Sequence, residues 1–268
     1  MVRFFCLSVS LILACSFAWA ENTGLKRLDT GDDGKKWEAV GRLDINGRGF
    51  CTGALVAPNL VLTAAHCLFD KTTGKRVNPE KIEFLAGWRN GRASAYRWVR
   101  RAVKHPDYDY NADVTSDRVR NDVALLELHH PINNTSVIPF KTDHRPRKGQ
   151  RIGVVSYARD RSEAPSLQEV CDVLARQNGV LVMSCDVDYG SSGAPIFSFE
   201  GGEARVVSVV SAMAEVDGRK VSLGTQLEKP MEILQAALDA GEGVFQDAAP
   251  KMFSSGERRN TGAKFSKP

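Results

Sequence analysis

Three short stretches of this sequence each carry a residue suited to acyl-transfer chemistry. His66 stands in Thr-Ala-Ala-His-Cys, Asp122 in Asn-Asp-Val-Ala-Leu-Leu, and Ser192 in Gly-Ser-Ser-Gly-Ala-Pro. A serine hydroxyl is mostly protonated at neutral pH, so it needs a neighbouring base to take its proton as it attacks a carbonyl carbon. Taken singly, the three residues also fit a core histidine, a turn aspartate and a loop serine. Together, in this order and context, they indicate nucleophilic catalysis by serine.

The neighbours of these residues support the same interpretation. Asp122 precedes the apolar run Val123–Leu126, so we expect a largely buried carboxylate, which can fix an imidazole tautomer and stabilise the imidazolium. Gly190 lies two residues before Ser192, where a backbone amide must approach a developing oxyanion without side-chain obstruction. The amides of Gly190 and Ser192 are therefore predicted to form an oxyanion hole.

The order of the residues argues against a rival class of hydrolase. The α/β-hydrolases place the histidine after the serine, whereas all five histidines here precede Ser192. A cysteine nucleophile is a second rival, but Cys171 and Cys185 are better explained as a disulfide.

The first 20 residues have the pattern of a signal peptide. Arg3 provides a positive start, residues 4–17 are almost wholly apolar, and Ala18-Trp19-Ala20 has the small-x-small form of a cleavage site before Glu21. The apolar run is shorter than the roughly 20 residues that span a bilayer. A lipid on the cysteine of Ile12-Leu13-Ala14-Cys15 is the weaker alternative. We expect a secreted or periplasmic protein.

Four of the six cysteines remain after such cleavage, an even number that suits an oxidising compartment. Four cysteines permit three pairings. Closeness in sequence favours Cys51–Cys67 and Cys171–Cys185, each closing a loop for which the chain-entropy model gives roughly 3 kcal/mol. A metal site is not expected, because the sequence contains no Cys-x-x-Cys pair and no cysteine–histidine cluster.

The pattern of the rest of the chain predicts two series of short strands followed by a helix. Short apolar runs cut by turn residues are typical of antiparallel β barrels. The first series comprises Ala39–Ile45, Gly53–Val56, Leu60–Thr63, Ile82–Ala86 and Val123–Leu128; the second comprises Arg151–Tyr157, Val180–Ser184, Ala194–Phe199, Val206–Ala212 and Val221–Leu227. Pro230 then opens a helical pattern that Gly241 ends.

These patterns predict seven segments. A signal peptide covers residues 1–20, an N-terminal extension 21–36, a first barrel 37–132, a connector 133–149, a second barrel 150–228, a helix 229–242 and a basic disordered tail 243–268. The tail is not expected to bind nucleic acid, because it lacks a structured frame.

From Gly41 to about Leu238 the sequence resembles the chymotrypsin/trypsin-like serine peptidases. Besides the three stretches above, Phe50-Cys51-x-Gly53 and His105-Pro106-x-Tyr108 are similar to segments of that family. The resemblance implies an all-β fold of two antiparallel six-stranded barrels with the active site between them. It also implies that His66 is the general base, Asp122 its partner and Ser192 the nucleophile of an endopeptidase.

The sequence departs from the animal members at the residue before the serine. They have an aspartate there, which pairs with a new N-terminus beginning Ile-Val-Gly-Gly or similar. This chain has Ser191, and no such tetrapeptide precedes His66. The pattern is closer to bacterial secreted members and glutamyl endopeptidases. Cleavage after Arg27 could remove a short propeptide, but nothing in the sequence requires it.

The resemblance also suggests a substrate preference. Asp186 stands six residues before Ser192, the spacing of the aspartate on the floor of trypsin's pocket, which implies cleavage after Arg or Lys; Cys185, however, does not fall where trypsin has its cysteine. Ser211 and Met213 are assigned to substrate binding, and Asp188 is an alternative acidic wall.

We expect a monomer that acts on protein or peptide substrates without a cofactor, a metal, nucleic acid or stable membrane insertion. The alternative function is a catalytically silent or unprocessed homologue that binds a partner. Its usual signature is a lost catalytic residue, and none of the three is lost.

Overall fold

The computed structural model describes residues 24–143 and 146–245 of the chain. The signal peptide predicted at residues 1–20 lies outside the described part, as do residues 246–268 of the predicted basic tail. Within the described part, no helix combines the length and apolar character needed to cross a membrane.

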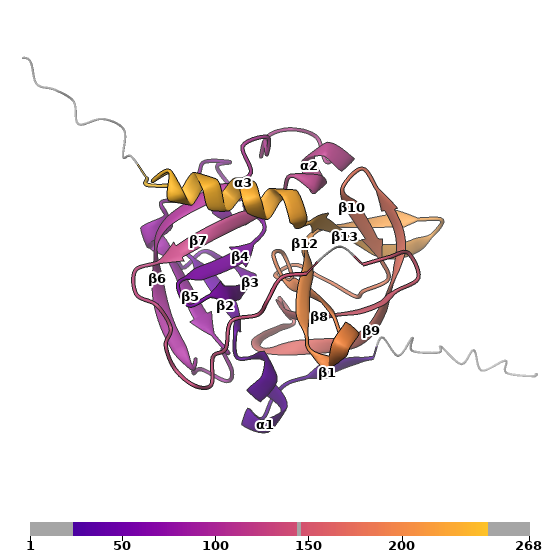
Figure 1. The fold of residues 1–268 in the computed structure, drawn as a ribbon, viewed down its shortest axis with the longest axis horizontal. Helices are drawn as coiled ribbons and strands as arrows, with labels where there is room; N and C mark the ends of the chain where they lie inside the picture. The colour runs from indigo at the N-terminus through magenta and orange to yellow at the C-terminus, as the bar shows by residue number, and fades with distance from the viewer. Residues whose placement is uncertain (1–23, 144–145, 246–268) are drawn as a thin grey trace, which may run out of the picture.

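The first half of the molecule is a closed antiparallel barrel (Figure 1). The order around the barrel is β2, β3, β4, β7, β6, β5. These strands are β2 (Val40–Ile45), β3 (Gly49–Ala57), β4 (Leu60–Thr63), β5 (Ile82–Ala86), β6 (Ala95–Lys104) and β7 (Ala124–Leu128). Asn46 and Gly47 turn the chain between β2 and β3 with φ of 54° and 62°, as a tight hairpin with positive φ at both central residues requires.

The second half is another antiparallel barrel, closed by pairing between β8 and β9. Its order is β9, β10, β13, β12, β11, β8, and the short strand β1 adds to the outer edge of β9. The strands are β1 (Leu25–Arg27), β8 (Arg151–Ala158), β9 (Arg161–Gln177), β10 (Val180–Met183), β11 (Pro195–Ser198), β12 (Arg205–Val216) and β13 (Arg219–Gln226). The predicted fold class, two six-stranded antiparallel barrels with a C-terminal helix, is confirmed.

Three strands were absent from the sequence prediction: β1, β6 and β9. β6 carries Arg97, Arg100 and Arg101, and β9 carries several acidic residues and Pro165, so neither reads as a plain apolar alternation. Barrel strands with one face toward solvent tolerate such charges, because only the inward residues must be apolar. The β1 segment is too short to give a pattern at all.

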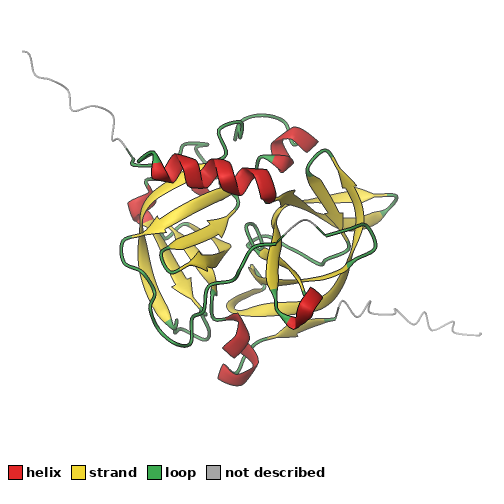
Figure 2. Ribbon diagram, in the orientation of Figure 1, coloured by secondary structure: helices red, strands yellow, loops and turns green. Residues whose placement is uncertain are grey.

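The helices lie outside the barrels (Figure 2). The C-terminal helix α3 (Glu228–Asp239) begins before Pro230, buries Leu234 and Leu238, and packs on β6 and β7. Arg101 of β6 donates from Nη1 to the carbonyl of Leu238 at 2.9 Å. The shorter helices are α1 (Gly31–Gly34) and α2 (Ser116–Arg120), with 3₁₀ turns at Lys35–Trp37, Ala65–Leu68, Pro79–Lys81 and Glu200–Gly202.

Three aromatic rings from separate parts of the chain meet in the largest hydrophobic core. Trp37 follows the N-terminal extension, Phe140 belongs to the connector, and Phe197 lies on β11. The ring of Phe197 has its centroid 4.9 Å from that of Trp37 and 4.8 Å from that of Phe140. Because the core cluster contains residues of both barrels, the two halves share buried apolar surface.

We predict that Trp37→Ala will lower the free energy of unfolding by about 3–5 kcal/mol, since it removes a buried ring and leaves a cavity. Chemical denaturation monitored by circular dichroism measures the change. Trp98→Ala is the matched control, because Trp98 is 51% exposed whereas Trp37 is 7% exposed. Equal losses in the two variants would contradict the proposed role of the aromatic cluster.

Candidate active site

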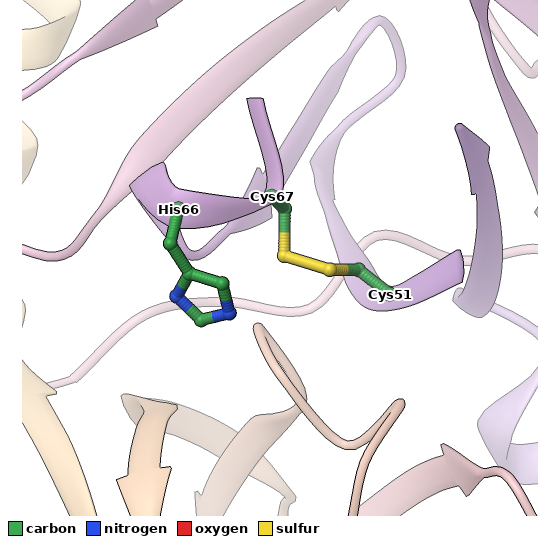
Figure 3. A group of neighbouring side chains, drawn as sticks. All are labelled: Cys51, His66 and Cys67. Atoms are coloured by element: carbon green, nitrogen blue, oxygen red, sulfur yellow. A yellow bond between two sulfur atoms is a disulfide. The ribbon is translucent and has the colours of Figure 1, made fainter. Parts of the chain in front are cut away.

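His66 lies in the 3₁₀ turn that follows β4, next to a disulfide. Cys67 is bonded to Cys51 of β3, so the turn is covalently fixed to the neighbouring strand. In Figure 3 the imidazole lies beside this disulfide. The three side chains lie close enough to hold a metal ion. Both sulfurs are oxidised, however, and metal binding needs thiolates, so the group does not fit a metal site.

A buried carboxylate orients the imidazole. Asp122, in the loop between α2 and β7, is 3% exposed. Its Oδ2 lies 2.7 Å from His66 Nδ1, and its Oδ1 accepts from the backbone N–H of His66 at 2.8 Å. An ionised carboxylate only accepts hydrogen bonds, so the His66 proton belongs on Nδ1 and the lone pair on Nε2.

Two residues of the second barrel complete the surroundings of Asp122. Ser211 of β12 donates from Oγ to Asp122 Oδ2 at 2.5 Å. Thr225 of β13 donates from Oγ1 to the backbone carbonyls of Val119 and Asp122, at 2.6 and 3.2 Å. The sequence assigned Ser211 to substrate binding and gave no signal for Thr225. Both contacts join residues far apart in the chain, which local patterns do not reveal.

Ser192 lies in the loop between β10 and β11, and its side chain is half-buried. Its backbone carbonyl accepts from the amide of Thr52 at 2.9 Å, which ties the loop to the first barrel. Gly193 follows with φ of 75°, and a Cβ there would lie 2.0 Å from the hydroxyl of Thr63. Among the described residues, the hydroxyl of Ser192 has no hydrogen-bond partner, and the imidazole of His66 bonds to Asp122 alone.

Two amides of this loop are left without acceptors. The carbonyl of Tyr189 accepts from the Arg159 amide at 2.7 Å, and the carbonyl of Ser191 accepts from the Ala194 amide at 2.9 Å. All peptide bonds here are trans, so the N–H groups of Gly190 and Ser192 point away from those bonded carbonyls. In the part of the chain that the structure describes, neither N–H has a hydrogen-bond partner.

Ser191 occupies a fully buried position with neutral partners. Its Oγ lies 3.2 Å from both Ser156 Oγ and the Tyr157 carbonyl, and it accepts from the amide of Asp188 at 3.3 Å. The strand β1 pairs with β9, and Ser166 of β9 lies opposite both Arg27 of β1 and Ser156 of β8. Because the Ser191 side chain is neutral, it cannot form an ion pair with a new N-terminus.

The residues assigned to the substrate pocket lie on two segments. Asp186 is half-buried, and its amide donates to Gln168 Oε1 at 2.8 Å. Its carboxylate has no hydrogen-bond or ionic partner among the described residues. The neighbouring Asp188 is exposed, and its carboxylate accepts from the Tyr189 amide at 2.6 Å. On β12, Met213 is 46% exposed.

The second disulfide joins Cys171 of β9 to Cys185, the residue before Asp186. Both disulfides match the pairing that closeness in sequence favoured, with separations of 16 and 14 residues. Cys185 therefore anchors the start of the segment that leads through Asp186 to Ser192.

The Trypsin-like peptidase domain model matches residues 51–207, more than half of the chain. This chain belongs to the trypsin-like peptidase family. Serine protease 23 of Mus musculus is 31% identical over 163 residues, which cover 55% of this chain and 42% of that protein. Glutamyl endopeptidase of Bacillus licheniformis is 25% identical over 150 residues, covering 56% and 45%. The chain thus spans less than half the length of these two relatives.

A solved structure of a Glu endopeptidase in complex with MPD has the same fold. Its TM-score is 0.66 at 16% identity, and the match covers 81% of this chain and 97% of that one. The resemblance to chymotrypsin/trypsin-like serine peptidases with bacterial relatives is confirmed.

His105 lies beside the site, since its amide donates to the carbonyl of Val123, the residue after Asp122. Burial lowers the pKa of His105 below its usual value; Lys104 and Arg120 act in the same direction, and Asp107 opposes them. The Asp107 amide donates to His105 Nδ1, which a neutral ring can accept.

Because the folded pKa of His105 is depressed, its contribution to stability is complete above about pH 6.5 and is lost as the pH falls below the unfolded pKa. We predict that the free energy of unfolding falls more steeply between pH 7 and pH 5 in the wild type than in His105→Asn. Urea denaturation at several pH values measures both slopes. Parallel slopes would show that His105 does not contribute.

Proposed function

We propose that this chain is a secreted serine endopeptidase that hydrolyses peptide bonds through an acyl-enzyme on Ser192. The observation that carries the proposal is the pairing of His66 with the buried carboxylate of Asp122, which presents Nε2 as a base. Membership of the trypsin-like peptidase family supports it. Export is proposed from the signal-like segment at residues 1–20, and the two disulfides support it.

In this proposal, Ser192 Oγ attacks the carbonyl carbon of the scissile bond while its proton passes to His66 Nε2. The oxyanion of the tetrahedral intermediate accepts hydrogen bonds from the amides of Gly190 and Ser192. The C–N bond then breaks, and the proton on His66 passes to the leaving amine. Water attacks the acyl-enzyme by the same route, releasing the acid and restoring the Ser192 hydroxyl.

The missing hydrogen bond between Ser192 and His66 is compatible with this mechanism. Catalytic hydrogen bonds are often long before substrate binds and shorten in the complex. The unpartnered hydroxyl of Ser192 and the two unpartnered amides beside it are the groups that a substrate carbonyl would engage. The side chain of His66 is 15% exposed, so it is not sealed from a substrate.

We predict that Asp122→Asn will lower kcat by about 10⁴-fold, because an amide can donate to Nδ1 and so hold the wrong imidazole tautomer. The chain beginning at Glu21 is incubated with a peptide library and, separately, with a fluorophosphonate that labels active serines. Ser192→Ala is the control and should abolish both cleavage and labelling.

Each outcome of this experiment bears on the proposal. Cleavage that requires Ser192 would establish the peptidase. Labelling at Ser192 without library cleavage would support a functional nucleophile of narrow specificity. Neither cleavage nor labelling would contradict the proposal and favour a silent homologue that acts as a binding protein.

For specificity, we propose cleavage after Arg or Lys, with Asp186 binding the cationic side chain and Ser211 and Met213 lining the pocket. The free, half-buried carboxylate of Asp186 supports this proposal, since a cation would offset its desolvation. The name of the glutamyl endopeptidase relative suggests the competing preference, cleavage after glutamate.

We predict that Asp186→Asn will lower kcat/KM for Arg and Lys substrates about tenfold or more, which corresponds to about 1.4 kcal/mol of transition-state binding. Asp188→Asn is the matched control and should change kcat/KM little. A larger loss in Asp188→Asn would move the binding role to that residue. If the wild-type protein cleaves the peptide library after glutamate, the proposed preference for Arg and Lys is overturned.

A further inference from the structure

One residue of the first barrel holds the loop that carries Ser192. Thr52, on β3 next to the disulfide residue Cys51, is 0% exposed. Its amide donates to the carbonyl of Ser192 at 2.9 Å, and its Oγ1 donates to the carbonyl of Gly190, also at 2.9 Å. The same Oγ1 accepts from the amide of Tyr157 on β8 at 3.1 Å.

We propose that Thr52 is a positioning residue that fixes the orientation of the oxyanion-hole amides through its hydroxyl. The inference rests on the proposed function, because it concerns the same site. It adds a residue that touches neither substrate nor the reacting atoms and that acts through the Gly190 carbonyl.

Four consecutive carbonyls of the loop each have one donor. The carbonyls of residues 189, 191 and 192 accept from backbone amides, those of Arg159, Ala194 and Thr52. Gly190 is the exception, because its carbonyl accepts from a side chain, the Thr52 hydroxyl. The bond on the Gly190 carbonyl therefore depends on the residue type at position 52, whereas the other three bonds are made by backbone alone. The amide of the same peptide unit, that of Ser191, donates to the Asp188 carbonyl at 2.9 Å.

The backbone of Gly190 is also the part of the loop that most needs a hydrogen bond to hold it in place. Its φ is 103°, a conformation that side chains disfavour and that glycine leaves with little cost. A Cβ there would lie 2.4 Å from the ring of Phe50, so no other residue fits in its place. Without the Thr52 hydroxyl, the peptide unit between Gly190 and Ser191 keeps only the bond from the Ser191 amide to the Asp188 carbonyl. This unit can then tilt about Gly190, and the neighbouring amides of Gly190 and Ser192 shift from the positions that an oxyanion requires.

The bond from Tyr157 fixes the direction of the Thr52 hydroxyl. A hydroxyl that accepts from one buried amide has its proton available for an acceptor on another side. The threonine side chain is also stiff at χ1 because it is branched at Cβ. Valine has nearly the same shape but no hydroxyl, so Thr52→Val leaves a carbonyl and an amide unpaired at a site sealed from water.

The test compares Thr52→Val and Thr52→Ser with the wild type. Acylation is followed with 4-nitrophenyl acetate, a small ester that does not require the specificity pocket, and kcat and KM are measured with the best peptide of the library. Loss of one oxyanion donor typically costs about 10²- to 10³-fold in rate, and a misdirected donor should cost part of that. We expect Thr52→Val to lower acylation and kcat by about 10- to 100-fold with KM little changed.

Two controls separate positioning from a general loss of structure. Thr52→Ser keeps the hydroxyl and should retain activity within about threefold. Ser198→Ala removes another buried hydroxyl, one that accepts from Gln150 Nε2 on the second barrel at 3.1 Å, and it should leave kcat unchanged. The pH dependence of kcat/KM should keep its midpoint in Thr52→Val, because Thr52 does not contact His66 or Asp122.

The possible results are distinguishable. A wild-type rate in folded Thr52→Val, or an equal loss in Thr52→Ser, would overturn the inference while leaving the proposed peptidase intact. Absence of any reaction at Ser192 in the wild type would refute the proposed function and the inference with it. If Thr52→Val does not fold, Thr52→Ala is measured in its place. A tenfold or larger loss of acylation rate and kcat in Thr52→Ala, with activity retained in Thr52→Ser, supports the inference.

Discussion

The site depends on burying one carboxylate between the two barrels. Asp122 is removed from water, and the cost of an unpaired buried charge is several kcal/mol, so its oxygens must receive hydrogen bonds. The first barrel supplies the His66 amide and imidazole, and the second supplies the Ser211 hydroxyl. The arrangement is complete only when both barrels are in place, which couples the shared apolar core to the chemistry.

A second set of contacts joins the barrels through β3. The disulfide Cys51–Cys67 fixes the histidine turn to β3, and the next residue of β3, Thr52, bonds to the Ser192 loop. The proposed base and the proposed nucleophile are thus both held by residues 51 and 52 of β3. Their relative positions depend on this short stretch as well as on the packing between the barrels.

The sequence predicted what short-range patterns encode. His66, Asp122 and Ser192 each stand in a distinctive local motif, and the disulfides join cysteines only 16 and 14 residues apart. The contacts that position these residues join distant parts of the chain: Ser211 to Asp122, Thr225 to Asp122 and Thr52 to Gly190 are separated by 89, 103 and 138 residues. No local signal marks a serine or threonine for such a contact. The strands β6 and β9 escaped prediction for a different reason, since their solvent-facing charges mask the inward alternation.

Because no aspartate precedes Ser192, other interactions must hold the loop that carries it. In the animal members, the aspartate at that position forms its ion pair only after cleavage has created a new N-terminus. Here Ser191 is buried with neutral partners, and the loop carbonyls on either side of it are already bonded. None of these bonds requires a free N-terminus. A loop held by a hydroxyl and backbone amides is ordered by folding itself. The proposed geometry of this loop therefore rests on contacts between the two barrels, and an ion pair at residue 191 takes no part in it.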